Sequence, residues 1–303
     1  MCKITLLTFV TPRSKIALLK KINDAGFVKL SAQLATDHYE RCAKNSSFLE
    51  MASAYYRQLG AYDKALEIRD RLVAIDPASA GNRFWRGKIF EGMGRFDKAL
   101  SDYISALDLL GRPEQVEANS FYEIATMYAA LGKYCEAATP LETYIAFNYA
   151  QRNTPQLGRV IDEYRSKGNC KKPTRSENAV IRAKRPGSVL LIQASLNNVS
   201  GVFVLDTGAS MVSVTKSFAM KSRIAIDSES EVTLQTANGL AKGILSTAKS
   251  VQVGSVSSTF VPVVVMEDKQ LGTDDDVVGL LGMSFLSRFD VTVTKDSVEL
   301  RSR

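Results

Sequence analysis

The chain has 303 residues, of which 45% are hydrophobic and 23% are charged, and its formal net charge is +7. This composition is typical of a globular protein, the length predicts two domains, and the lack of an 18-residue apolar stretch predicts no transmembrane span. His38 is the only histidine, so a Ser-His or Cys-His mechanism would depend on this single residue. Its polar neighbours predict a surface position on a helix, and the composition favours chemistry that needs only carboxylates.

Residues 1–30 are expected to form an N-terminal segment that ends in a lead-in helix. The sequence begins MCKITLLTFVTPRSK, with a seven-residue apolar run at the lower edge of a signal-peptide core. A degenerate export signal and a mis-assigned start are both open, so the sequence does not decide between a cytoplasmic and a periplasmic location. The four cysteines, at positions 2, 42, 135 and 170, lack zinc-ligand spacing, although two could bridge in an oxidising compartment.

Three segments within residues 31–165 align on a glycine: LGAYDKAL at Gly60, MGRFDKAL at Gly94 and LGKYCEAA at Gly132. The offsets between these glycines are 34 and 38 residues. Aromatic residues lie four positions before each glycine and alanines lie five positions after it: Tyr56, Phe90 and Tyr128, and Ala65, Ala99 and Ala137. A period near 34 residues, with a helix on each side of a glycine turn, resembles tetratricopeptide (TPR) repeats.

This resemblance implies an all-α solenoid over residues 31–165, whose concave face binds a peptide or a protein partner. The large ring would pack between the two helices of a repeat, and the alanine would let the second helix come close. Leu72, Tyr144 and an insertion at residues 110–113 depart from the family pattern. A solenoid that only spaces or dimerises the second half of the chain is the alternative.

Residues 166–186 are predicted to form a basic linker between the two domains. Helical periodicity disappears there, and Lys, Arg, Gly, Pro and Ser dominate. A solvated linker is favoured over an anion-binding segment, because neither interleaved aromatic residues nor a nucleic-acid-binding module accompany the charges. No nucleic-acid partner is therefore expected.

From residue 187 to residue 303 the pattern changes to short strands and turns, as in a compact all-β barrel. The expected strands are 189–192, 202–205, 251–254, 260–266, 290–294 and 297–300. The strand Val202–Leu205 runs directly into Asp206-Thr207-Gly208, and an acid in that position is costly unless it has a use. Gly208 permits a tight turn, while the hydroxyls of Thr207 and Ser210 can hold a carboxylate.

Two further motifs follow Asp206-Thr207-Gly208 in order. Thr236, Ala237, Asn238 and Gly239 form the turn of a predicted β-hairpin, and Leu280-Leu281-Gly282 ends an apolar strand before a short helical segment. The three motifs in this order resemble the bacterial retropepsin-like aspartic proteases, over residues 187–303. The resemblance implies an acid-protease barrel in which the hairpin is a flap over the active site.

By resemblance, the activity is that of an aspartic endopeptidase that acts on polypeptides and needs neither metal nor cofactor. Two carboxylates would share one proton across a water, one as base and the other as donor to the scissile carbonyl. Because the chain has a single Asp-Thr-Gly, we expect a homodimer with Asp206 and its symmetry mate on the two-fold axis. Thr207 would join the two turns, Gly208 would allow their close approach, and Ser210 would hydrogen-bond the Asp206 carboxylate.

Two other functions stay open at this point. The chain could be a non-catalytic TPR adaptor whose β domain dimerises, or a regulator that cleaves only itself, within the basic linker. The intact Asp206-Thr207-Gly208 favours the enzyme weakly, and the repeats fit either function.

Overall fold

The chain forms two compact units, residues 1–102 and residues 103–303, and the division lies within helix α6, Phe96–Leu109. The structure is a computed structural model, and it describes residues 12–42, 44–170, 178–182, 189–270, 276–294 and 297–302. The apolar run at the N-terminus, most of the basic segment and the Lys295-Asp296 turn lie outside the described residues.

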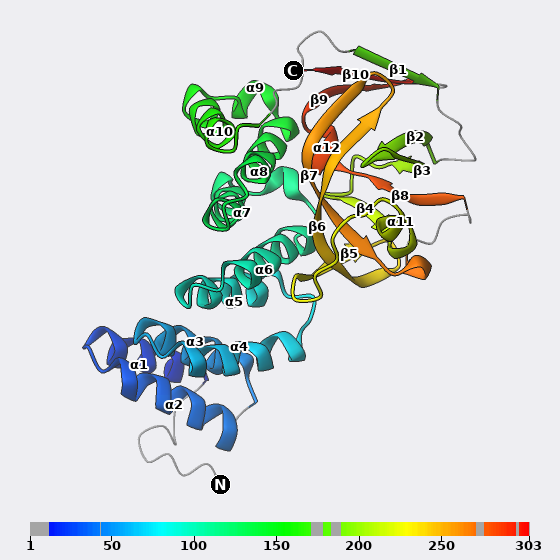
Figure 1. The fold of residues 1–303 in the computed structure, drawn as a ribbon. Helices are drawn as coiled ribbons and strands as arrows, with labels where there is room; N and C mark the ends of the chain where they lie inside the picture. Colours follow the sequence, from blue (N-terminus) through cyan, green and yellow to red (C-terminus); the bar gives the residue numbers. More distant parts are fainter. Residues whose placement is uncertain are drawn as a thin grey trace. The chain divides into compact units, whose positions relative to one another are not determined.

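The described part of the first unit is helical (Figure 1). Its helices are α1 Pro12–Asp24, α2 Val28–Arg41, α3 Ser46–Gln58, α4 Tyr62–Ile75, α5 Ala80–Gly92 and the first half of α6. Each of α1 to α4 packs against the next helix in the chain. Two helices, α1 and α2, stand where a single lead-in helix was expected, because Gly26 at φ 90° turns the chain between them.

The repeat signature has the same backbone geometry in all three copies. Gly60, Gly94 and Gly132 have φ of 71°, 71° and 72°. The amide after each glycine donates to the carbonyl of the aromatic residue four positions before it: Ala61 to Tyr56, Arg95 to Phe90 and Lys133 to Tyr128, each at 2.9 Å. This is the Schellman arrangement, which ends the first helix of each pair. Ala65, Ala99 and Ala137 are fully buried, so the predicted TPR-like repeat is confirmed.

His38 lies in the core of the first unit, and its expected surface position is wrong. The side chain is only 1% exposed, and its ring centroid lies 4.2 Å from that of Phe48. Helix α2 packs against both α1 and α3. The polar residues around His38 in the sequence occupy the other faces of the helix.

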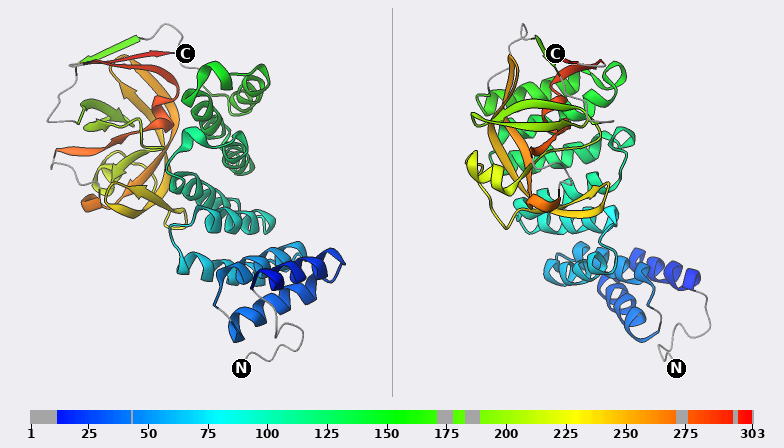
Figure 2. Two further views of the ribbon diagram at one scale, coloured as in Figure 1. Left: turned by 180° about the vertical axis from the view of Figure 1, so that it is seen from behind. Right: turned by 90° about the vertical axis from the view of Figure 1, so that its right-hand side faces the viewer.

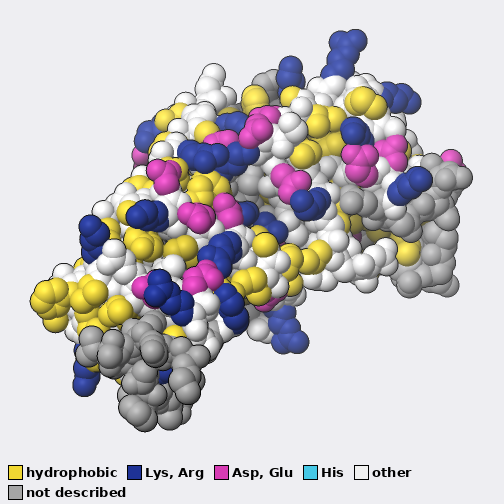
Figure 3. All heavy atoms as spheres, turned by 90° about the horizontal axis from the view of Figure 1, so that it is seen from below, with side chains coloured by type: hydrophobic (Ala, Val, Ile, Leu, Met, Phe, Trp, Pro, Cys, Tyr) yellow, Lys and Arg dark blue, Asp and Glu magenta, His cyan; other side chains and the backbone are white. Residues whose placement is uncertain are grey.

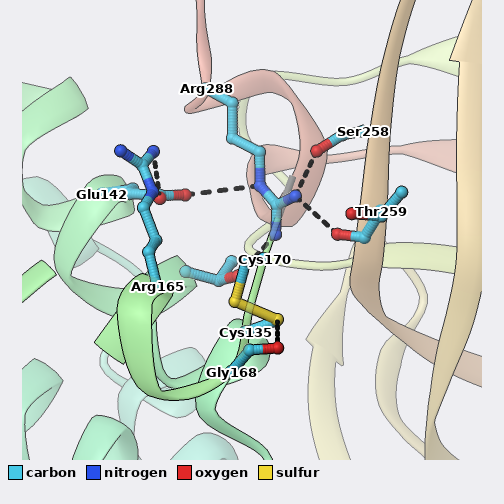
Figure 4. Close-up of a disulfide and its surroundings, with 9 residues drawn as sticks. Cys135, Glu142, Arg165, Gly168, Cys170, Ser258, Thr259 and Arg288 are labelled. Atoms are coloured by element: carbon cyan, nitrogen blue, oxygen red, sulfur yellow. Dashed lines mark hydrogen bonds and ion pairs between the residues drawn. A yellow bond between two sulfur atoms is a disulfide. The ribbon is translucent and has the colours of Figure 1, made fainter. Parts of the chain in front are cut away.

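The helical part of the second unit begins with Tyr103 to Leu109 of α6. It continues with η1 Pro113–Gln115, α7 Ala118–Ala130, α8 Tyr134–Phe147, α9 Tyr149–Arg152 and α10 Pro155–Lys167. The insertion at residues 110–113 leads into η1, and α8 packs against both α7 and α10. A disulfide joins Cys135 at the start of α8 to Cys170 after α10 (Figure 4).

The rest of the second unit is the expected all-β barrel. The strands of the larger sheet are β2 Leu191–Leu196, β3 Val199–Leu205, β4 Val212–Thr215, β5 Glu231–Thr236, β6 Gly239–Val253, β7 Val256–Met266 and β8 Val277–Leu281. Their order is β2-β3-β8-β4-β7-β6-β5, and a further pairing of β2 with β6 closes the sheet. Asn197 and Asn198, at φ 49° and 68°, form the expected turn between β2 and β3. The short helices are α11 Lys216–Lys221, η2 Asp268–Gln270 and α12 Met283–Leu286.

A second sheet contains a strand from the predicted linker. Its order is β1-β10-β9, with β1 Asn178–Arg182, β10 Ser297–Ser302 and β9 Phe289–Val293. The expectation of a solvated linker over 166–186 does not hold for β1, because its backbone pairs with β10 from Asn178↔Arg301 to Arg182↔Ser297. The change from helices to strands still falls in this segment, between Lys167 and Asn178.

Helices of the second unit pack on its barrel, so this compact unit crosses the predicted domain boundary (Figure 2). Helix α8 packs against β7 and α12. Its residues Ala146 and Phe147 pack against the apolar core of the barrel, where Phe203, Phe285 and Phe289 are fully buried. Among the described residues, no helix has the length and apolar character needed to cross a membrane.

Candidate active site

Asp206 lies at the point where two strands end side by side. Strands β3 and β8 are parallel, with Leu205 opposite Leu281. The amide of Asp206 donates to the carbonyl of Leu281 at 3.1 Å. The first motif and the Leu280-Leu281-Gly282 motif, 74 residues apart by their numbering, are thus joined by a backbone hydrogen bond.

The carboxylate of Asp206 has a fixed orientation. Its Oδ1 accepts hydrogen bonds from the amides of Gly208 at 2.9 Å and Ala209 at 3.2 Å. Asp206 is partly exposed, and Thr207 and Gly208 are exposed. The turn therefore presents both the acid and the backbone next to it to solvent.

Gly282 holds the second motif against the active-site turn. A Cβ atom at this position would lie 2.3 Å from the carbonyl oxygen of Met211 and 2.7 Å from that of Ala209. Two backbone hydrogen bonds continue the contact, from the Met283 amide to the Ala209 carbonyl at 2.8 Å and from the Ser284 amide to the Ser210 carbonyl at 3.1 Å. Only glycine permits this backbone approach.

The hairpin predicted at TANG is present, formed by β5 and β6. Thr236 pairs with Gly239, which leaves Ala237 and Asn238 in the turn, and Gly239 has φ of 101°. The hydroxyl of Thr236 donates to the Gly239 carbonyl at 2.8 Å and accepts from the Asn238 amide at 3.2 Å. These two bonds stabilise the end of the hairpin.

The three motifs meet in one cleft of about 400 Å³. The active-site turn contributes Asp206 and residues 208–211, the hairpin contributes residues 234–238, and the second motif contributes Leu280. The structure therefore brings together motifs that the sequence separates. Gly239, Leu281 and Gly282 support this arrangement from outside the lining of the cleft, and Thr207 is exposed and does not line it.

Asp108, on α6, is a cleft residue that the sequence did not indicate. Its Oδ1 accepts a hydrogen bond from the hydroxyl of Ser210 at 2.5 Å. The expected bond from Ser210 to Asp206 is thus replaced, because a hydroxyl has one proton to donate. Burial raises the pKa of Asp108, although hydrogen bonds from Ser210 and Gln235 oppose this shift. No local pattern marks Asp108, which lies 102 residues before Ser210.

The described residues contain no group of three or more His, Cys, Asp or Glu side chains arranged to hold a metal ion. On the face shown in Figure 3, Lys and Arg side chains are interspersed with Asp and Glu side chains of the described residues. The charge on this face is therefore mixed.

The part of the chain that holds this site is similar to known proteins. Residues 192–288 match the family described as "gag-polyprotein putative aspartyl protease". A retropepsin-like aspartic protease from Rickettsia conorii is 32% identical over 42% of this chain and 90% of that chain, with a TM-score of 0.31. No curated protein sequence matches the chain.

The helical region is similar to two solved structures of low sequence identity. A thermophilic TPR protein from Thermus thermophilus is 18% identical over 52% of this chain and 82% of that chain, with a TM-score of 0.38. MamA from Desulfovibrio magneticus is 17% identical over 46% of this chain and 77% of that chain, with a TM-score of 0.41. The chain has a TPR-like helical region followed by a β-rich domain. By the sequence of that β-rich domain, it belongs to the retropepsin-like aspartic proteases.

Proposed function

We propose that the chain is an aspartic endopeptidase that hydrolyses peptide bonds of polypeptide substrates. The observation that carries this proposal is the Asp206 carboxylate, oriented by two backbone amides in a cleft that it shares with a hairpin. An extended polypeptide fits such a cleft as an added strand, and closure of the hairpin over it would exclude water.

The proposed reaction uses Asp206 from each of two protomers. One carboxylate, ionised, takes a proton from the attacking water, while the other, protonated, donates to the oxygen of the scissile carbonyl. Two carboxylates that share one site cannot both ionise readily. Their two apparent pKa values therefore describe the pair and not either residue. Cleavage should therefore have a bell-shaped dependence on pH.

The exposure of Thr207 and Gly208 supports a homodimer. Each protomer has one Asp-Thr-Gly, and a two-fold axis at this turn would place both Asp206 side chains in one site. We propose that Thr207 joins the two turns there and that Gly208 lets them approach. The hairpin at Thr236 to Gly239 is proposed to be the flap of each protomer.

Cleavage of a peptide library tests the activity. Wild type should cleave, Asp206→Asn should not, and a pepstatin-type inhibitor should block wild type. Asp227→Asn is a matched control, because Asp227 is an exposed acid outside the cleft whose Oδ1 accepts a local hydrogen bond from the Glu229 amide. Equal cleavage by Asp206→Asn and wild type would refute the proposal.

Mixing protomers tests the dimer. Wild type combined with a threefold excess of Asp206→Asn should lose activity well beyond simple dilution, because most wild-type protomers would then pair with an inactive one. Activity that follows dilution alone, together with sedimentation as a monomer, would contradict the shared site.

We propose that the helical region recruits substrates or protein partners. The repeat geometry supports this role, since stacked helix pairs form extended binding surfaces. Deletion of residues 1–102 should lower the cleavage of a folded protein substrate more than that of a short peptide. An equal effect on both substrates would argue against recruitment.

A further inference from the structure

The carboxylate of Asp108 joins two parts of the cleft. Oδ1 accepts from the hydroxyl of Ser210, in the active-site turn. Oδ2 accepts from the backbone amide of Gln235 at 2.7 Å, in the strand that leads to the hairpin turn. One side chain of α6 is therefore bonded to both the catalytic turn and the hairpin.

The bond to Gln235 belongs to a regular pattern along an edge strand. Among the described strands, β5 is the last of its sheet, with β6 as its neighbour. Residues two apart point their amides to the same side, and the amides of Thr233 and Gln235 both donate to α6. Ser105 Oγ accepts from Thr233 at 2.9 Å, and Asp108 Oδ2 accepts from Gln235.

Ser105 and Asp108 are three residues apart and so lie on one face of α6. Their spacing matches the two outward-facing amides of β5, and this pairing satisfies donors that an edge strand otherwise leaves free. The bond to Gln235 has a charged acceptor when Asp108 is ionised, which makes it stronger than a neutral bond.

We propose that Asp108 is a positioning residue of the protease, which holds the hairpin strand in place relative to the catalytic turn. The inference rests on the proposed endopeptidase function, because its consequence is an ordered substrate cleft. By this inference, the C-terminal end of α6 contributes to the protease cleft. Asp108 acts through Ser210 and Gln235 and is not required to take part in proton transfer.

Hydrogen exchange tests the contact without reference to activity. Deuterium uptake is measured by mass spectrometry, with fragmentation to single residues, in wild type, Asp108→Ala and Asp108→Asn. Asp108→Ala should speed exchange of the Gln235 amide about tenfold to a hundredfold, the range expected for loss of a hydrogen bond to a charged group. Asp108→Asn keeps one oxygen as acceptor and should restore most of the protection.

Ser105→Ala is the matched control, since it removes the neighbouring bond on the same helix face. It should speed exchange at Thr233 and leave Gln235 close to wild type. Far-ultraviolet circular dichroism and the unfolding midpoint establish that each variant is folded. Asp108→Leu, which also removes both oxygens, supplies the comparison if Asp108→Ala does not fold. Unchanged exchange at Gln235 in a folded variant that lacks both Asp108 oxygens, Asp108→Ala or Asp108→Leu, would overturn the inference.

Steady-state kinetics on a cleaved peptide then test positioning. Asp108→Ala should raise KM about tenfold with a smaller change in kcat, and Asp108→Asn should rescue KM, because the loss is one of cleft order. If wild type cleaves and Asp108→Ala has an unchanged KM, the positioning role of Asp108 is rejected and the proposed endopeptidase function stands. Lack of cleavage by wild type would instead reject the proposed function and, with it, the positioning role.

Discussion

Arg288 Nε lies 3.3 Å from Glu142 Oε2, and the two side chains are only 8% and 11% exposed. Arg288 lies just after α12, the short helix that follows the Leu280-Leu281-Gly282 motif, and Glu142 lies on α8. The Arg288 guanidinium also donates to the Thr139 hydroxyl at 2.7 Å. It donates to the Thr259 carbonyl at 2.9 Å (Figure 4). One buried cation thus bonds to a helix and to strand β7 of the same unit.

Glu142→Ala should destabilise the chain by about 3 kcal/mol, because it leaves the buried Arg288 charge without its carboxylate. Urea unfolding at neutral pH measures this change. Lys216→Ala is the control, since it breaks an ion pair with Glu267 whose side chains are 48% and 66% exposed, and such pairs contribute little. A Glu142→Ala effect no larger than that of the control would contradict the prediction.

The packing of α8 on the barrel leads to a prediction about fragments. Residues 103–303 should fold as a unit, whereas residues 176–303 should be markedly less stable, although both keep β1. The shorter fragment loses the contacts of Ala146 and Phe147 with the barrel core and leaves Arg288 without Glu142. Thermal unfolding of the two fragments provides the comparison, and equal midpoints would show that the barrel does not need the helices.

The elements that sequence patterns predicted are those set by local chemistry. Gly60, Gly94 and Gly132 mark the ends of α-helices, where the glycine backbone is in the left-handed region. Asn197-Asn198 and the TANG segment mark turns. Few residue types suit these backbone conformations. Contacts between distant segments left no such pattern. The Asp108–Ser210 bond spans 102 residues, and β1 pairs with β10 across more than 100 residues of chain, so neither follows from local composition.

His38 shows a different reason for failure. Its neighbours in the sequence are polar, but a helix turns successive residues to different faces, so neighbours do not report the environment of one side chain. The core position of His38 depends on Phe48 of the next helix, which lies ten residues further along the chain.

The Cys135–Cys170 disulfide should stabilise the second unit. It joins residues 35 positions apart, and closing a loop of that length corresponds to about 3–4 kcal/mol in the chain-entropy model. Cys135→Ser, Cys170→Ser and the double variant should each lose this amount in urea unfolding, because each removes the same bond. Losses that add in the double variant would indicate that the two side chains act independently.

Burial raises the pKa of Asp108 from its ordinary value of 3.8, so the folded chain holds this proton more tightly than the unfolded chain does. The resulting stabilisation is fully present below the unfolded pKa and is lost as pH rises through the folded pKa. Unfolding free energies of wild type and Asp108→Asn, measured from pH 4 to pH 7, should therefore diverge. The Asn side chain does not titrate, so Asp108→Asn should be more stable relative to wild type at pH 7 than at pH 4.

Glu231→Gln serves as the control for this pH dependence, because Glu231 lies at the start of the same strand in an exposed pair with Lys242. Its stability relative to wild type should change little over the same range, since exposed pairs contribute little. The measurement gives the balance of two effects on the pKa of Asp108, the hydrogen bonds that favour its ionised form and the burial that opposes it. A constant difference between Asp108→Asn and wild type from pH 4 to pH 7 would mean that the two effects cancel, and the folded pKa of Asp108 would then lie at its unfolded value.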